Sequence, residues 1–210
     1  MLWMHFFDSG VTLRLPTGPL IFAIGDSKTV AVNAGYIGYP PVLLNLLFTE
    51  TGQSWYELVP RGALYGGTVL NFKNSIIAGA LDTYTDIPTY ILANWGVNDI
   101  DSEGTTQAAF EANYGYVLDA LHAKWPNAKI YLMRPWWVTT PESQILMNAM
   151  DDTWIPNILS TRGDFAFLGP DERIFLENGD NGATLTDDGC HPNAAGYQAT
   201  AAAWLSVLPV

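Results

Sequence analysis

The sequence predicts an α/β protein in which a five-stranded parallel sheet is covered by helices on both faces. Five short apolar runs alternate with segments of helical spacing. The runs are continuously apolar, which is typical of strands buried on both faces. Polar residues gather directly after these runs, where sheets of this class bind their ligands. No internal repeat or linker interrupts this pattern.

The first half of the chain contains three of the expected strands. The expected elements are a strand over 19–24, a helix over 41–48, a strand over 55–59, a helix over 69–81 and a strand over 88–95. The first strand stops at Gly25, a residue typical of tight turns. Pro41 favours a helix start. Val69, Phe72 and Ile76 recur at steps of three and four residues, which predicts an amphipathic helix.

The second half continues the alternation. The expected elements are a helix over 105–125, a strand over 128–133, a helix over 141–159, a strand over 165–168 and a helix over 193–208. Thr105 or Thr106 is the expected cap of the first helix, and Pro126 ends it. Pro156 should kink the second helix, because its ring removes a backbone donor. The last helix is rich in alanine.

Composition excludes several classes of protein. The 210 residues include 9 Lys or Arg and 21 Asp or Glu, a net charge of −12, so a basic face for nucleic acid is not expected. With 49% hydrophobic and 14% charged residues, the chain has enough apolar surface to fold. We expect one domain over 1–210, with an N-terminal extension over 1–18.

No targeting or metal-binding pattern stands out. The sequence has no window of eighteen apolar residues, so no membrane span is expected, and the opening residues lack the features of a signal peptide. The sequence does not indicate in which cellular compartment the protein works. A single cysteine, Cys190, cannot form an intrachain disulfide, and with only three histidines a structural zinc site is not expected.

Three polar turns carry complementary chemistry. They are the turns at 25–27, 96–99 and 188–193. A serine hydroxyl becomes a nucleophile when an imidazole takes its proton, and a carboxylate can orient that imidazole. Asp188 lies three residues before His191, so one turn can aim both toward Ser27. Asp187 is the alternative carboxylate. Taken alone, Ser27 could simply cap a helix.

Ester hydrolysis also needs donors for the oxygen that becomes negatively charged. The backbone N–H of Ser27, the backbone N–H of Gly66 and the side-chain amide of Asn98 are available. Glycine suits this task because substrate can approach its backbone without meeting a Cβ atom.

In these motifs the sequence resembles the GDSL-type, or SGNH, hydrolases. Gly25-Asp26-Ser27 matches the nucleophile block, Gly96-x-Asn98-Asp99 the third block, and Asp188-x-x-His191-Pro192 the last block. The blocks stand in the family's order and cover nearly the whole chain. The resemblance implies a flavodoxin-like three-layer α/β/α sandwich. It also implies a serine esterase without metal or cofactor.

The resemblance also assigns roles to individual residues. It implies that Ser27 is the nucleophile, His191 the general base and then acid, and Asp188 the carboxylate that orients it. The oxyanion hole would be Ser27, Gly66 and Asn98.

The chain departs from the family pattern at two positions. Gly67 replaces the usual Asp of the second block, so Gly66, Gly67 or Gly62 could be the donor. Lys28 stands where the family commonly has leucine, and it could contact an anionic substrate group or a neighbouring carboxylate.

Other residues near the turns have less specific roles. Asp26 and Asp99 are expected to hold loop backbone, and Cys190 to be a packed side chain. Trp95, Trp136 and Trp137 lie next to strand ends and are the expected substrate contacts, one of the two adjacent tryptophans pointing outward.

The sequence therefore predicts an esterase that cleaves small acyl esters through an acyl-enzyme. Its expected partner is a small-molecule ester, with acetylated carbohydrate favoured by the aromatic residues and by what the family often does. The alternatives are a catalytically weak carbohydrate-binding module on a hydrolase fold and an acyltransferase that uses the same site. The oligomeric state and the acyl chain length stay open.

Overall fold

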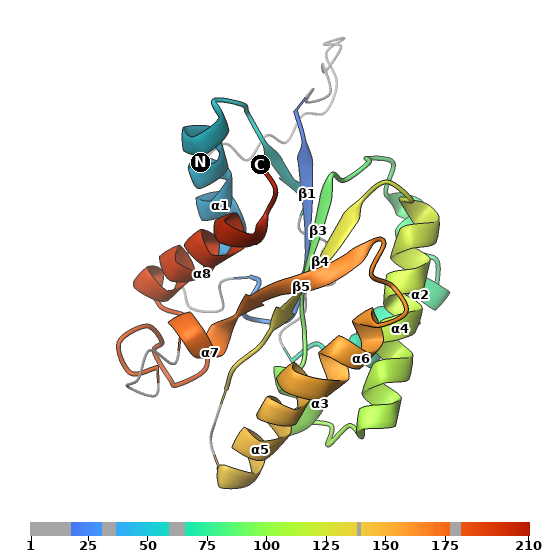
Figure 1. Ribbon diagram of the computed structural model, residues 1–210, viewed down its shortest axis with the longest axis vertical. Coiled ribbons are helices and arrows are strands. Elements are labelled where there is room, and N and C mark those ends of the chain that lie inside the picture. The colour runs from blue at the N-terminus through green and yellow to red at the C-terminus, as the bar shows by residue number, and fades with distance from the viewer. Residues whose placement is uncertain (1–17, 31–36, 59–65, 138–139, 177–181) are drawn as a thin grey trace, which may run out of the picture.

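A parallel sheet with strand order β2-β1-β3-β4-β5 forms the centre of the molecule (Figure 1). The computed structural model describes residues 18–30, 37–58, 66–137, 140–176 and 182–210. The strands are β1 (Leu20–Gly25), β2 (Tyr56–Leu58), β3 (Tyr90–Asn94), β4 (Lys129–Arg134) and β5 (Ala166–Asp171). All four pairings between neighbours are parallel, which confirms the expected five-stranded parallel sheet.

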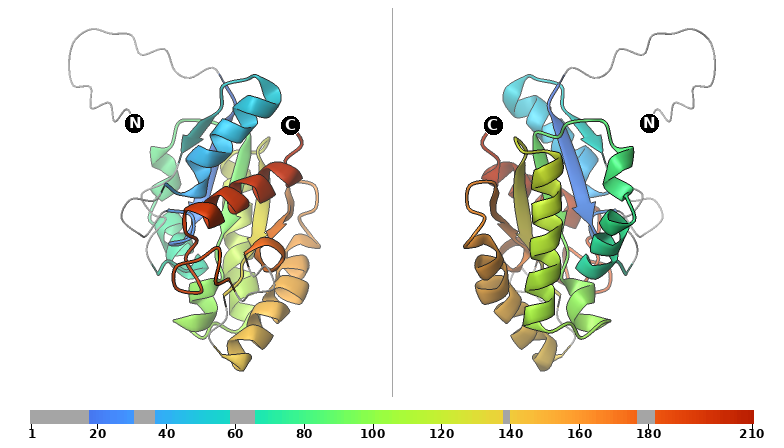
Figure 2. Two further views of the ribbon diagram at one scale, coloured as in Figure 1. Left: turned by 90° about the vertical axis from the view of Figure 1, so that its left-hand side faces the viewer. Right: turned by 90° about the vertical axis from the view of Figure 1, so that its right-hand side faces the viewer.

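Helices cover both faces of this sheet, as the sequence predicts. The longer helices are α1 (Tyr39–Thr51), α2 (Val69–Ile77), α4 (Gln107–Lys124), α5 (Pro141–Ala149) and α8 (Ala194–Val207). Figure 2 shows α1 and α8 together on one face and α4 on the other. The arrangement is a three-layer α/β/α sandwich. None of the helices within the described ranges is long and apolar enough to cross a membrane.

The two hydrophobic cores follow from the two-residue period of the strands. In β1, Phe22 and Ile24 pack into the core on the α4 side, whereas Ile21 and Ala23 pack into the core on the α1 and α8 side. Because both sets of side chains are buried, the strand is apolar throughout its length.

Two expected helices are interrupted. The helix expected over 69–81 ends at Ile77, because Gly79 adopts a φ of +87°, and a short 3-10 helix, η1 (Ala80–Thr83), follows. The helix expected over 141–159 contains a π-helical turn, η2 (Met150–Trp154), before α6 (Ile155–Leu159). This irregularity lies directly before Pro156, which has no N–H to continue the α-helical pattern.

Two short helices have no counterpart in the sequence-based expectation. These are α3 (Val97–Asp101) and α7 (Glu172–Phe175), which follow β3 and β5 directly. Neither is long enough to show an apolar period. The N-terminal extension expected over 1–18 lies almost wholly outside the described residues and stays a prediction.

The strand order places a switch point between β1 and β3. The chain leaves β1 toward β2 on one side and returns as β3 on the other, so the loops after β1 and β3 diverge from neighbouring strand ends. Gly25 pairs with Asn94 at these ends. A Cβ atom on Gly25 would lie 2.4 Å from the Asn94 carbonyl oxygen and 2.2 Å from the Thr29 hydroxyl. Glycine therefore allows the two strand ends to approach.

We expect Gly25→Ala to destabilise the protein by about 2 kcal/mol or more, because the added methyl group must separate β1 from β3 or displace Thr29. For a chain of this length this corresponds to a fall in melting temperature of roughly 4–8 °C. Gly163→Ala is the matched control, since its Cβ would lie 3.9 Å from the Leu159 carbonyl oxygen, an ordinary van der Waals contact. Equal melting temperatures for both variants would contradict the close-approach argument.

Candidate active site

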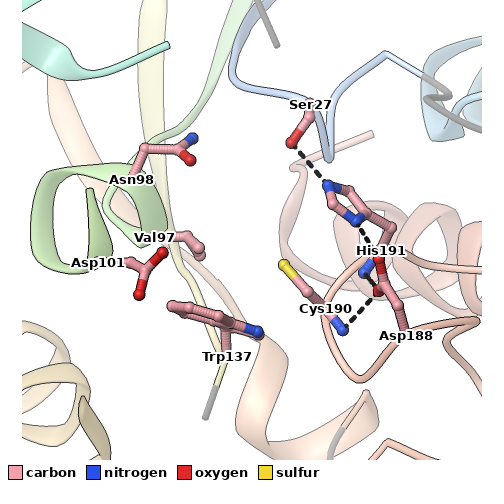
Figure 3. A pocket seen from close by; sticks show the side chains of 8 residues that line it. All are labelled: Ser27, Val97, Asn98, Asp101, Trp137, Asp188, Cys190 and His191. Atoms are coloured by element: carbon pink, nitrogen blue, oxygen red, sulfur yellow. Dashed lines mark hydrogen bonds and ion pairs between the residues drawn. The ribbon is translucent and has the colours of Figure 1, made fainter. Parts of the chain in front are cut away.

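The three polar turns meet at one pocket beyond the carboxyl ends of the strands. Ser27 comes from the turn after β1, Asn98 from α3, and Asp188 and His191 from the turn that precedes α8. The cavity has a volume of about 240 Å³, and its other lining residues are Val97, Asp101, Trp137 and Cys190 (Figure 3). The structure thus brings together residues that lie far apart in the sequence.

Hydrogen bonds fix the turn that carries Ser27. The Asp26 N–H donates to the Asn94 carbonyl oxygen of β3 at 3.1 Å, and the Thr29 N–H donates to the Asp26 carbonyl oxygen at 3.1 Å. The Asp26 carboxylate accepts the Lys28 N–H at 2.9 Å. Ser27 itself is 6% exposed. The backbone around Ser27 is therefore held by β3 and by the adjacent aspartate.

Ser27, His191 and Asp188 form a continuous hydrogen-bonded chain. Ser27 Oγ lies 3.0 Å from His191 Nε2, and His191 Nδ1 lies 2.7 Å from Asp188 Oδ2. A carboxylate bound to Nδ1–H leaves Nε2 able to accept the serine proton. This is the geometry that a serine nucleophile needs, and it joins the three residues that the sequence analysis selected.

The second oxygen of Asp188 shapes the turn itself. Asp188 Oδ1 accepts the N–H groups of Cys190 at 2.9 Å and His191 at 2.7 Å. Burial alone would raise the pKa of Asp188, but the hydrogen bonds from the His191 side chain and these N–H groups lower it. Asp188, and not Asp187, therefore presents an ionised carboxylate to the imidazole. Gly189 completes the turn with a φ of +80°.

Asn98 lies beside the glycine pair of the second block. Its Nδ2 donates to the Gly67 carbonyl oxygen at 3.2 Å and lies 3.4 Å from Asp26 Oδ2. Ser27 and Asn98 both line the pocket, whereas neither Gly66 nor Gly67 is among its lining residues. Gly62, the third candidate donor, lies outside the described residues. The choice of glycine in the oxyanion hole stays a prediction.

Asp26 and Asp99 hold backbone, as expected. Asp99 accepts the Val69 N–H at the start of α2, with its two oxygens 3.2 and 3.3 Å away. Burial raises the pKa of Asp26 and of Asp99 to about 7. Cys190 is also buried, and burial raises the pKa of its thiol to about 12, so it remains a protonated, packed side chain at neutral pH.

Only one of the three tryptophans expected to contact substrate lines the pocket. Trp95 and Trp136 are each 1% exposed. Trp95 packs against Phe72, with ring centroids 4.8 Å apart. The expected substrate contact is therefore corrected for both residues, because a side chain packed in the core cannot meet a ligand. Trp137 is half-buried and faces the pocket (Figure 3).

The structure adds residues that the sequence analysis missed. Asp101 lines the pocket from α3, three residues after Asn98. Residues three apart lie on the same face of a helix, so this spacing could have placed Asp101 beside Asn98. Lys28 was expected to contact either an anionic substrate group or a neighbouring carboxylate. It forms a buried ion pair with Glu172, so its partner is a carboxylate of the protein. No sequence pattern linked these two positions. Within the described ranges, no three His, Cys, Asp or Glu side chains gather into a metal-binding group.

Comparison with known proteins gives one family match and several structural matches. The model of the GDSL-like Lipase/Acylhydrolase family matches residues 23–199. No curated protein matches the sequence.

Three solved structures illustrate the structural similarity. A family 3 carbohydrate esterase from Clostridium thermocellum matches with a TM-score of 0.64 and 19% identity, over 90% of this chain and 94% of that chain. A family 3 carbohydrate esterase from Talaromyces cellulolyticus gives 0.66 and 17%, over 88% and 93%. An acetylxylan esterase from Geobacillus stearothermophilus gives 0.68 and 19%, over 90% and 93%. At such identities the likeness concerns the fold.

The raised pKa of Asp99 predicts how Asp99→Asn changes stability with pH. The folded protein holds the Asp99 proton up to about pH 7, whereas the unfolded chain releases it near 3.8. The contribution of Asp99 to stability is therefore present below about pH 4 and is lost as the pH rises toward 7. Asparagine cannot ionise and still offers an oxygen to Val69.

We therefore expect Asp99→Asn to gain stability over the wild type between pH 4 and pH 8, by up to about 4 kcal/mol. Calorimetric melting temperatures across this range measure the difference, with Asp164→Asn, at an exposed position, as control. A constant difference between Asp99→Asn and wild type would contradict the expected ionisation.

Proposed function

The chain belongs to the GDSL-like Lipase/Acylhydrolase family and is a carboxylic ester hydrolase, and we propose that it works through a Ser27-His191-Asp188 triad and an acyl-enzyme. The observation that carries this proposal is the hydrogen-bonded chain of 3.0 and 2.7 Å from Ser27 through His191 to Asp188. Such a chain lets a neutral serine attack an ester carbonyl at neutral pH.

The reaction follows from the roles of these side chains. His191 takes the Ser27 proton as Oγ bonds to the ester carbon, and the imidazolium then gives that proton to the leaving alcohol. A water activated by His191 next attacks the acyl-enzyme and releases the acid. Asp188 keeps the imidazole oriented and stabilises its positive charge in both steps.

The negative charge on the carbonyl oxygen needs nearby donors. The Ser27 N–H and the Asn98 side-chain amide both belong to pocket-lining residues, and we assign the third donor to Gly66. Each such donor is worth about 10²–10³ in rate. Asp26 and Gly67 accept from Asn98 Nδ2 and so hold the amide beside the pocket. Its two N–H groups are both used in these bonds, so one of them, the longer 3.4 Å bond to Asp26, must give way when the amide donates to the oxyanion.

Solvent access favours hydrolysis over acyl transfer. The side chains of His191 and Asp188 are 24% and 53% exposed. Water can therefore reach the acyl-enzyme from the side of the general base. A site built to transfer the acyl group to another alcohol would have to exclude water during this step.

The pocket favours an ester that is small, neutral and rich in hydroxyl groups. Among the residues that the structure describes, its lining includes two carboxylates, Asp101 and Asp188, and no Lys or Arg, so an anionic substrate would be repelled. Figure 3 shows Asp101 and Trp137 on the side of the pocket opposite His191. An indole ring and a carboxylate suit the apolar face and the hydroxyls of a sugar. The carbohydrate esterases among the structural matches support the same substrate class.

We expect Ser27→Ala and His191→Ala each to lower kcat for p-nitrophenyl acetate by about 10⁴-fold or more, because each removes a group that forms or breaks bonds. Release of p-nitrophenol measures the rate. His122→Ala is the matched control, since His122 lies in α4 and stacks on Phe165. Unchanged turnover in the Ser27 or His191 variant would contradict the proposal, and sugar binding without any turnover in the wild type would favour a binding module.

The proposed sugar substrate predicts that changes at Trp137 and Asp101, which lie opposite His191 in the pocket, affect KM for acetylated sugars selectively. We expect Trp137→Ala to raise KM for glucose pentaacetate by about 2- to 10-fold, since ring contacts of this kind contribute about 0.5–1.5 kcal/mol. Asp101→Asn should raise KM for a singly acetylated sugar, whose other hydroxyl groups stay free to donate, by about 5-fold, because the acceptor loses its charge. Acetate release measures both. With p-nitrophenyl acetate, Asp101→Asn should change KM little; an equal change with both esters would argue against a hydroxyl contact.

A further inference from the structure

A buried ion pair joins the turn of the nucleophile to the segment that follows the edge strand β5. The Lys28 ammonium donates to Glu172 Oε2, and their side chains are 1% and 0% exposed. Lys28 directly follows Ser27, and Glu172 begins α7 after β5. Opposite charges of this kind, removed from water, interact strongly only while their geometry is maintained.

The pair holds the backbone of Trp136 from both sides. Lys28 Nζ donates to the Trp136 carbonyl oxygen at 2.7 Å, and the Trp136 N–H donates to Glu172 Oε2 at 2.8 Å. Trp136 immediately precedes Trp137, the aromatic residue of the pocket. The ion pair therefore connects Lys28, which follows Ser27, with Trp136, which precedes Trp137. We call the side of the pocket formed by Trp137 the Trp137 wall.

Glu172 is itself held in place by its neighbours in the chain. Asp171 accepts the Arg173 N–H at the start of α7 and forms an ion pair with Arg134 at 3.1 Å. Arg173 reaches Asp151 in η2 at 3.2 Å. The carboxylate that receives Lys28 thus projects from a segment fixed to β4 and to η2.

Stability alone does not account for this arrangement. Apolar side chains of similar volume usually stabilise a core as well as a buried ion pair does, because the pair must first lose its hydration. What charged groups add here is directional bonding between two loops that both reach the pocket.

We propose that Lys28 and Glu172 are positioning residues that hold Ser27 and the Trp137 wall in one fixed geometry. The proposal rests on the function proposed above, because it concerns how the acyl group at Ser27 and the alcohol at Trp137 are placed relative to each other. A displacement of about 1 Å between reacting groups can lower the rate by about 10²-fold.

The test is the double variant Lys28→Met/Glu172→Gln. It removes both charges and conserves volume, and the glutamine oxygen can still accept the Trp136 N–H. Only the link from the Lys28 side chain is lost. Each single variant leaves one buried charge without its partner and should lower the melting temperature by about 6–20 °C. The double variant should recover to within about 4 °C of the wild type.

We expect the double variant to lose between about 10- and 100-fold in kcat for p-nitrophenyl acetate, and to show a higher KM for glucose pentaacetate, although it is folded. The matched control, Arg162→Met/Asp119→Asn, removes a partly exposed ion pair of 2.7 Å on the α4 side and should leave both constants unchanged. Wild-type kcat and KM in the folded double variant would overturn the proposal.

Two further measurements decide the remaining cases. If the double variant does not fold, Glu172→Asp keeps both charges but withdraws the carboxylate by one methylene, and wild-type kinetics in that variant would overturn the proposal. Amide hydrogen exchange at 26–30 and 133–137 tests the link without any turnover. Exchange should accelerate there in the double variant and not in the control. Faster exchange in a protein that cleaves no ester would refute the proposed function alone, and unchanged exchange would refute the positioning role.

Discussion

The approach of two strand ends, β1 and β3, determines where everything else in the site lies. Gly25 and Asn94 are paired at these ends, and the backbone of Asp26 continues the contact by donating to Asn94. Past this point the two loops separate, one carrying Ser27 and the other Asn98. Ser27 and Asn98 therefore line one pocket because the strand order reverses at this place in the sheet.

Carboxylates provide much of the support around this pocket, and most of them bind backbone rather than ligand. The N–H groups of Lys28, Val69, His191 and Trp136 donate to Asp26, Asp99, Asp188 and Glu172, respectively. Each carboxylate satisfies donors that a tight loop leaves without a strand or helix partner. Part of the acidic composition thus serves to build loops, and the net charge says little about what the enzyme binds.

The sequence was informative wherever one local pattern determined the structure. Continuous apolar runs predicted the strands, and the three-residue spacing of Asp188 and His191 predicted a shared turn. Where the outcome depended on distant packing, prediction failed. Whether Trp136 or Trp137 faces the pocket depends on the partners of each ring and its backbone, and Glu172 lies 144 residues from Lys28. The π-helical turn before Pro156 likewise depends on how η2 packs, beyond the effect of proline itself.

The bond between Ser27 and His191 closes a loop of 164 residues, and this separation has a consequence for biosynthesis. The ribosome makes Ser27 164 residues before His191, the base in the proposed function. A nascent chain that still lacks the last turn holds a serine with no imidazole to activate it. Helix α8 must also dock on α1, where Trp204 stacks on Tyr39, for that turn to have a rigid support. On the proposed function, reactivity toward esters therefore requires that the turn carrying His191 has been synthesised and that α8 has docked.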